Sequence, residues 1–209
     1  GVNKLSGTEH TIGSDLLEIG GYIVMAAVTG SEIIVEDIVP EEIRVIDSTY
    51  RKLGIHYELS GSELTVPAHQ KLSIKPDFVG DIPKIDDGTW PAFPTDLMSI
   101  VIVAATQAEG TALFFEKMYD GRMFFTDHLI GMGARIVLCD PHRVVVVGPS
   151  VLYGTTVHSP DIRAGMALVI AALCAKGETT IYNIRQIDRG YENLEEKLQS
   201  LGAEIHRVV

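Results

Sequence analysis

Residues 161–182 read DIRAGMALVIAALCAKGETTIY, and this stretch decides the fold class of the chain. Asp161 precedes a long apolar run, Gly177 follows the run, and a short segment rich in threonine and isoleucine comes next. An aspartate before such a run is typical of a helix N-cap, and glycine suits the left-handed backbone position just after a helix. The stretch therefore predicts a buried helix that leads into a strand.

The same pattern occurs in two earlier parts of the chain. Apolar runs begin after Asp15 and Asp96, end at Gly30 and Gly110, and lead into strand-like segments at 32–35 and 112–115. Second helices, with apolar residues three and four positions apart, are expected over 43–53 and 191–201. Further strands are expected at 55–59, 63–66, 135–138, 143–147 and 204–208.

A repeated unit that cannot bury its own apolar face must stack on its neighbours. We therefore expect a single α/β domain over residues 1–209, built from three pseudo-symmetric repeats at about 11–66, 92–149 and 158–209. The helices should lie inside and the sheets outside. Because the third repeat stops before its last strand, that strand is either missing or supplied from elsewhere.

Composition excludes several kinds of partner. The chain has 209 residues, is 46% hydrophobic and carries a formal charge of −11, so it should bind nucleic acid and anionic membranes poorly. No apolar run reaches the roughly 18 residues that a membrane helix needs. Cys139 and Cys174 form no disulfide framework, and neither they nor the seven histidines show metal-ligand spacing. We expect no metal site, and a reducing cytoplasm as the location.

Four strings carry a resemblance to a known family. They are PAFPTD at 91–96, GMGA at 131–134, DIRAG at 161–165 and IDRGYE at 187–192. Together they resemble the second domain of the UDP-N-acetylglucosamine 1-carboxyvinyltransferases, from about Gly7 to Val209. The first and last strings are specific to this family. The repeated order of helix, glycine and strand is not specific to it, because the 5-enolpyruvylshikimate-3-phosphate synthases share this order.

The resemblance implies an enolpyruvyl transferase-like inside-out α/β barrel that forms the carboxyl-terminal half of a bacterial, cytoplasmic enzyme. That enzyme transfers enolpyruvate from phosphoenolpyruvate to the 3′-hydroxyl of UDP-N-acetylglucosamine, the first committed step of peptidoglycan synthesis, without a cofactor. Its active site lies between two domains, so the implied partner is the amino-terminal domain. Because the family's reactive cysteine loop belongs to that domain, we expect the isolated chain to be inactive.

Two aspartates are the candidate catalytic residues. By resemblance Asp96 contacts the sugar hydroxyl and acts as its base, a task that suits a carboxylate. Asp161 lies near the phosphoenolpyruvate site by the same resemblance. Both aspartates stand at expected helix starts, so the alternative for each is a plain N-cap.

Three arginines are the candidate substrate-binding residues: Arg122, Arg163 and Arg189. A guanidinium matches phosphate and carboxylate bidentately and stays charged. Arg163 stands in a first helical turn, where the helix dipole disfavours it, and this favours a functional reason over a solvated side chain. Arg189 precedes a glycine, is expected to open a helix, and resembles the arginine that binds phosphoenolpyruvate. Arg122 resembles another arginine of the family's cleft. The alternative, which stays open, is that Arg122 is a solvated arginine at the start of a helix.

Two other functions remain open. One is a non-catalytic binding or scaffold domain with the same fold. The other is half of a shikimate-pathway enolpyruvyl transferase, against which the strings at 91–96 and 187–192 speak.

Overall fold

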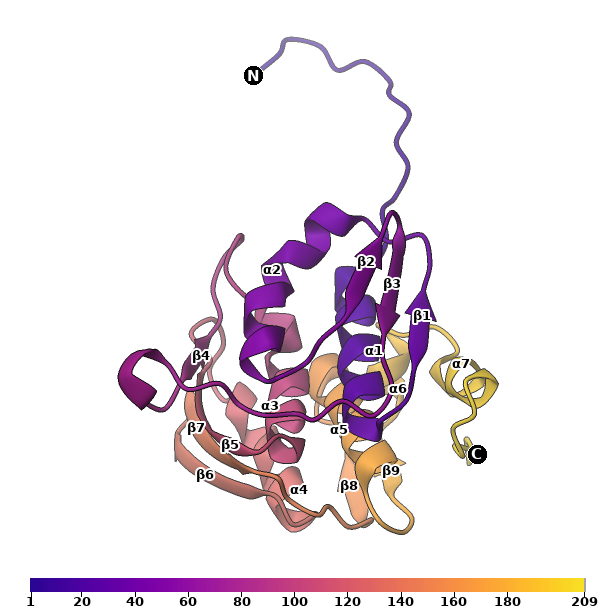
Figure 1. The fold of residues 1–209 in the computed structure, drawn as a ribbon. Helices are drawn as coiled ribbons and strands as arrows, with labels where there is room; N and C mark the ends of the chain where they lie inside the picture. The colour runs from indigo at the N-terminus through magenta and orange to yellow at the C-terminus, as the bar shows by residue number, and fades with distance from the viewer. Residues whose placement is uncertain (209) are drawn as a thin grey trace.

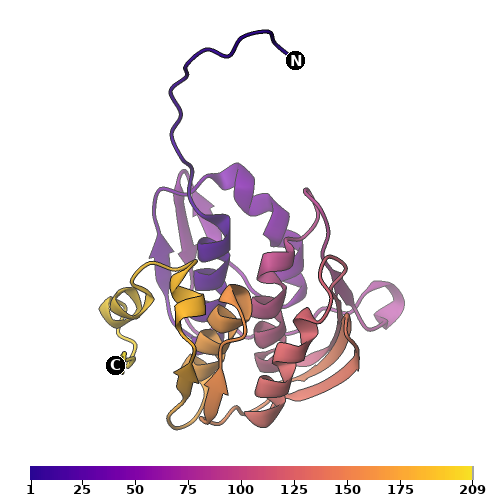
Figure 2. The same cartoon turned by 180° about the vertical axis from the view of Figure 1, so that it is seen from behind.

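Three apolar helices pack against one another in the middle of the molecule. In the computed structural model, which describes residues 1–208, they are α1 (Leu16–Thr29), α3 (Met98–Gln107) and α5 (Ile162–Cys174). Residues 98–106 of α3 are all buried, as expected of a helix that is covered on every side. Figures 1 and 2 show the strands outside this group of helices. The predicted arrangement of helices inside and sheets outside is confirmed.

Three sheets cover the central helices. The first has the order β1-β3-β2 and is antiparallel, with β1 at Ile33–Val35, β2 at Glu58–Ser60 and β3 at Glu63–Val66. The second has the order β4-β5-β7-β6, with β4 at Lys84–Asp86, β5 at Gly110–Phe115, β6 at Arg135–Asp140 and β7 at Arg143–Gly148. In it β4 is parallel to β5, and β7 is antiparallel to both β5 and β6. The third is the parallel pair β8 (Thr156–His158) and β9 (Thr180–Tyr182). The strands β4 and β8 were not predicted.

The other helices lie around this frame. They are α2 (Pro40–Lys52), α4 (Thr126–Gly131), α6 (Arg185–Asp188) and α7 (Leu194–Ser200), with 3₁₀ turns at Phe78–Gly80, Thr95–Leu97 and Arg122–Phe125. The helix predicted over 191–201 therefore starts later than expected. The residues before α1 extend away from the body of the molecule (Figure 1).

Two of the three predicted N-caps are present. Asp15 Oδ1 accepts hydrogen bonds from the amides of Leu17 and Glu18 at 2.8 and 3.3 Å. Asp161 Oδ1 accepts from the amides of Arg163 and Ala164 at 2.7 and 2.9 Å. Asp96 makes no such bond, because it lies inside the 3₁₀ turn that precedes α3. The capping alternative for Asp96 is therefore wrong.

The strand predicted over 204–208 does not form, and this is a correction. Within the described residues no strand pairs with this segment, since the third sheet consists of β8 and β9 alone. Arg207 instead donates to Asp188 at 2.7 Å and pairs with Glu195, which fixes the segment against α6 and α7. The predicted end of the third repeat, Val209, lies outside the described residues.

Gly165 allows α6 to pack against α5. A Cβ at this position would lie 2.4 Å from Ser159 Oγ and 2.6 Å from Ile187 Cγ1. We expect Gly165→Ala to lower the free energy of unfolding by about 1–3 kcal/mol, as overpacking typically does. Gly131→Ala is the matched control, because nothing lies within 4 Å of its Cβ and alanine favours helix. Urea unfolding of both variants measures the difference, and equal stabilities would contradict this packing.

Candidate active site

All five predicted site residues line one cavity of about 440 Å³. The cavity is bounded by Asp96, Tyr119, Asp120, Gly121, Arg122, Asp161, Ile162, Arg163, Gln186 and Arg189. The start of α3, the turn at Arg122–Phe125, the start of α5 and the end of α6 supply these residues. Segments far apart in the sequence thus bring two aspartates and three arginines together.

Asp96 lies between two of the arginines. Its Oδ1 is 3.2 Å from Arg122 Nη1, and its Oδ2 is 3.0 Å from Arg163 Nη2. The Asp96 side chain keeps 31% of its surface exposed, whereas Arg122 keeps 14% and Arg163 keeps 20%. A carboxylate held by two half-buried cations, yet still reachable from the cavity, can accept a hydrogen bond or a proton from a bound hydroxyl.

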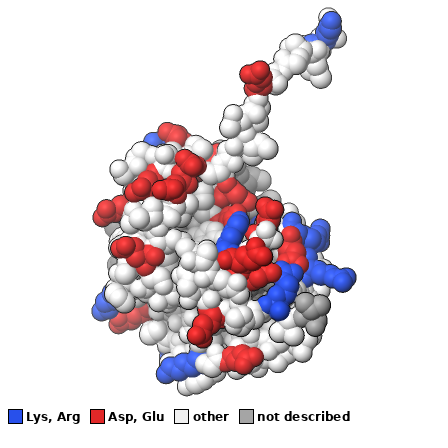
Figure 3. Space-filling view, turned by 90° about the vertical axis from the view of Figure 1, so that its right-hand side faces the viewer, with Lys and Arg blue, Asp and Glu red and all other residues white. Residues whose placement is uncertain are grey.

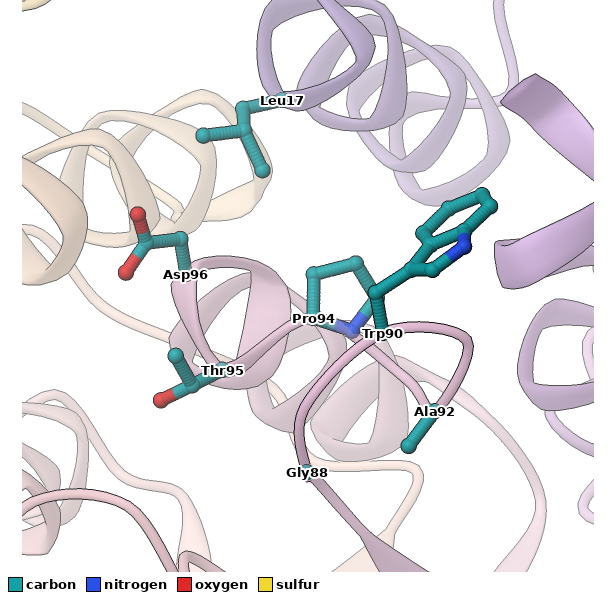
Figure 4. A pocket seen from close by; sticks show the side chains of 7 residues that line it. All are labelled: Leu17, Gly88, Trp90, Ala92, Pro94, Thr95 and Asp96. Carbon is teal, nitrogen blue, oxygen red and sulfur yellow. The ribbon is translucent and has the colours of Figure 1, made fainter. Parts of the chain in front are cut away.

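A second, smaller hollow of about 200 Å³ also reaches Asp96. It is lined by Leu17, Gly88, Trp90, Ala92, Pro94, Thr95 and Asp96. Figure 4 shows Pro94 between Asp96 and the ring of Trp90, with Leu17 of α1 across the opening. Trp90 is 69% exposed, so this hollow has an apolar rim beside a carboxylate.

Asp161 and Arg189 differ from Asp96 in their local roles. Asp161 lies at the cavity, but one of its oxygens caps α5, so the capping alternative is observed and its catalytic role stays a prediction. Arg189 does not open a helix as predicted; it is the C-cap residue of α6. Its Nη1 donates to Gln186 Oε1 at 3.1 Å and the residue is exposed. Arg189 therefore has room to move toward a bound anion.

One buried acid near the cavity was not among the predicted site residues. Glu116 follows β5 directly and is fully buried. Its carboxylate accepts from Thr95 Oγ1 at 2.8 Å, from the Met118 amide at 2.9 Å and from the Tyr119 amide at 3.1 Å. Burial, followed by hydrogen bonding with Asp87, raises the pKa of Glu116 to about 7. The available signal was an acid placed immediately after an apolar strand.

Other functional groups lie away from the cavity. Among the described residues, no cluster of three histidine, cysteine, aspartate or glutamate side chains could hold a metal ion. Cys139 and Cys174 line neither hollow. Burial raises the pKa of the Cys174 thiol to about 12, which keeps this thiol protonated.

The charge of the cavity differs from that of the chain as a whole. Figure 3 shows acidic side chains spread over one face of the molecule, with basic side chains gathered beside some of them on one side. The formal net charge of the chain is −11, whereas the cavity is lined by three arginines and three aspartates, so its formal charges balance. In the part of the chain that the structure describes, no helix is long and apolar enough to cross a membrane.

The chain belongs to the EPSP synthase (3-phosphoshikimate 1-carboxyvinyltransferase) family, whose model matches residues 1–198. It is 57% identical over 98% of its length to a UDP-N-acetylglucosamine 1-carboxyvinyltransferase of Treponema denticola. It is 56% identical over its whole length to the protein of the same name in Borreliella burgdorferi. These relatives confirm the resemblance seen in the sequence strings. The chain spans about half of their length, 48% and 49% respectively.

Solved structures show the same fold. The enolpyruvyl transferase NikO from Streptomyces tendae matches 94% of the chain with a TM-score of 0.80 and 24% identity. EPSP synthase from Acinetobacter baumannii matches 95% with a TM-score of 0.68 and 16% identity. The chain covers 45% and 44% of these two structures. The predicted enolpyruvyl transferase-like α/β fold is confirmed.

Proposed function

We propose that this chain is the carboxyl-terminal half of a UDP-N-acetylglucosamine 1-carboxyvinyltransferase and supplies one wall of its active-site cleft. The observation that carries the proposal is the gathering of Asp96, Arg122, Arg163 and Arg189 around one cavity. The identity of 57% and 56% to the Treponema denticola and Borreliella burgdorferi proteins of that name supports it. The reaction would be the first committed step of peptidoglycan synthesis in the bacterial cytoplasm, with the amino-terminal half as partner.

Each of these side chains would have a separate role in the reaction. The acceptor hydroxyl gives up its proton as its oxygen bonds to C2 of phosphoenolpyruvate, and C3 gains a proton. Loss of phosphate from C2 together with a proton from C3 then restores the double bond. Asp96 would take the hydroxyl proton. Arg163 and Arg189 would hold the phosphate and carboxylate of phosphoenolpyruvate, and Arg122 would hold Asp96 in place and add positive charge. Asp161 would fix the start of α5, on which Arg163 stands.

A shikimate-pathway transferase is the second candidate, since the matching family model carries that description. The test is phosphate release by a full-length protein containing this half, with phosphoenolpyruvate and either UDP-N-acetylglucosamine or 3-phosphoshikimate as acceptor. We expect release only with the nucleotide sugar. Release only with 3-phosphoshikimate would move the chain to the other pathway. No release with either acceptor would favour a scaffold role.

Arg189→Ala in that full-length enzyme should raise the KM for phosphoenolpyruvate. One charge-assisted hydrogen bond contributes about 1.5–3 kcal/mol, which corresponds to roughly 10- to 150-fold. Arg189→Lys should recover part of this loss, because an ammonium cannot make the bidentate contact. Steady-state kinetics on both substrates measures the effect, with Arg44→Ala, an exposed arginine of α2, as control. An unchanged KM and kcat would place the anion site elsewhere.

A further inference from the structure

Glu116 and Asp87 are two buried carboxylic acids beside the candidate active site. Asp86 pairs with Phe115 in the parallel strands β4 and β5, so Asp87 and Glu116 follow directly at the same end of the two strands. Glu116 is 0% exposed and Asp87 is 2% exposed. Asp87 Oδ1 accepts from the amide of Lys117 at 2.6 Å. Asp87 Oδ2 is buried and has no hydrogen-bond donor among residues 1–208. An unsatisfied buried carboxylate oxygen is costly, so this atom needs a donor that the other side chains do not supply.

A proton on Glu116 would supply that donor. Two carboxylates that share a buried site cannot both ionise easily, and one of them then keeps its proton. Burial and the neighbouring Asp87 raise the pKa of Glu116 to about 7, in agreement with this. The protonated Glu116 would donate to Asp87 Oδ2, and its other oxygen would still accept from Thr95 and two backbone amides.

The pair is linked to Asp96 by a short chain of contacts. Thr95 Oγ1 donates to Glu116, and the same oxygen accepts from Arg122 Nη1 at 2.8 Å. Arg122 Nη1 also donates to Thr95 O at 2.8 Å and to Asp96 Oδ1 at 3.2 Å. Arg122 Nε lies 3.9 Å from Glu116 Oε2. Glu116 therefore directs the Thr95 hydroxyl, and through the Thr95 oxygen it supports one of the contacts that hold Arg122.

We propose that Glu116 and Asp87 share one proton and act together as a positioning unit for enolpyruvyl transfer, holding Thr95 and Arg122 against Asp96. This inference rests on the proposed function for its kinetic part only. The charged or titratable groups around the pair are Arg122 and, through it, Asp96; Lys117 and Asp86, which pair with each other; and His142, which contacts the Glu116 carbonyl oxygen and Asp120.

The first test uses the stability of the 209-residue chain. Because the pKa of Glu116 is raised from 4.5 to about 7 in the folded state, the stabilisation by its proton is fully present below about pH 4.5 and is lost as the pH rises through about 7. Glu116→Gln has no such proton to lose. The Tm of Glu116→Gln minus that of the parent should therefore rise between about pH 5 and about pH 8. A difference that stays constant with pH overturns the shared proton.

The second test uses kinetics of full-length Glu116→Gln, Asp87→Asn and the double variant. Either amide alone can donate across the pair, so we expect each single variant to lower kcat/KM for phosphoenolpyruvate by only about threefold. In the double variant two NH₂ groups face each other or displace the backbone amides, and the charge facing Arg122 is gone. Its kcat/KM should fall at least about tenfold below the product of the single effects. Glu58→Gln, on an exposed strand, is the unaffected control.

The outcomes separate this inference from the proposed function. Additive losses in the double variant, in protein that is shown to be folded, overturn the positioning role. If the parent full-length enzyme does not use UDP-N-acetylglucosamine, the proposed function fails, and the pH dependence of Tm still decides the shared proton. If the double variant loses stability but keeps the parental kcat/KM at a temperature where it is folded, the pair is structural only and the inference is wrong.

Discussion

Asp96→Asn in the full-length enzyme is expected to lower kcat by about 10²–10⁴, the usual effect of losing a general base. Asparagine has nearly the same shape and can keep one hydrogen bond to the sugar hydroxyl, but it cannot take the proton. The nucleotide sugar should therefore still bind with a KM close to that of the parent. Steady-state kinetics on both substrates, with circular dichroism to confirm folding, measures the effect.

The ion pairs of Asp96 give this prediction a second readout. Arg122 and Arg163 both lie within 3.2 Å of its carboxylate, and Asp96→Asn removes the negative charge that they share. Both guanidinium groups then become freer to hold another anion. We expect the KM for phosphoenolpyruvate to stay level or fall, whereas an unfolded or collapsed site would raise it.

Asp15→Asn is the matched control for Asp96→Asn. Asp15 starts α1 as Asp96 precedes α3, but Asp15 is a true N-cap and lines neither hollow. Asparagine caps a helix about as well as aspartate, so this variant should keep both its stability and its kcat. A kcat near the parental value in Asp96→Asn as well would remove the catalytic assignment.

The fold was predictable because its main signal is local. The apolar runs after Asp15, Asp96 and Asp161 are long enough to be read as helices without knowing what covers them. The three-residue strands β4 and β8 were missed, whereas the equally short β1 and β9 were predicted because each follows an apolar run that ends at a glycine. The segment 204–208 was predicted as a strand from its place in the third repeat, but no described strand pairs with it. The residue pattern of a segment can indicate a strand, but the strand forms only where another strand pairs with it.

The candidate site was predictable only in part. The five residues at the cavity were identified because the sequence strings resemble a known family, and the structure shows that they lie together. Glu116 and Asp87 carried no such motif, and burial of an acid depends on contacts between residues far apart in the chain, such as the bond from Thr95. Arg189 was assigned to the wrong end of a helix because α6 has only four residues and no side-chain cap.

The 209-residue chain on its own is expected to release phosphate from phosphoenolpyruvate and UDP-N-acetylglucosamine only at the background rate. The chain spans about half of the length of its relatives, and its cavity holds candidate groups from one side of the proposed cleft. Enzymes of this kind depend on orientation of two substrates and on fixed charge around the reacting atoms. Half of a cleft provides neither water exclusion nor a fixed position for the acceptor hydroxyl.

The assay compares the purified chain with a full-length enzyme that contains it, at equal concentrations and with both substrates in excess. Effective molarities for well-oriented reactants reach about 10⁵–10⁸ M, so loss of orientation alone is sufficient to bring turnover to background. Adding the separately produced amino-terminal half should restore some turnover if the two halves dock, and Asp96→Asn in the added chain should abolish that gain. Clear turnover by the chain alone would mean that the cavity around Asp96 is a complete active site.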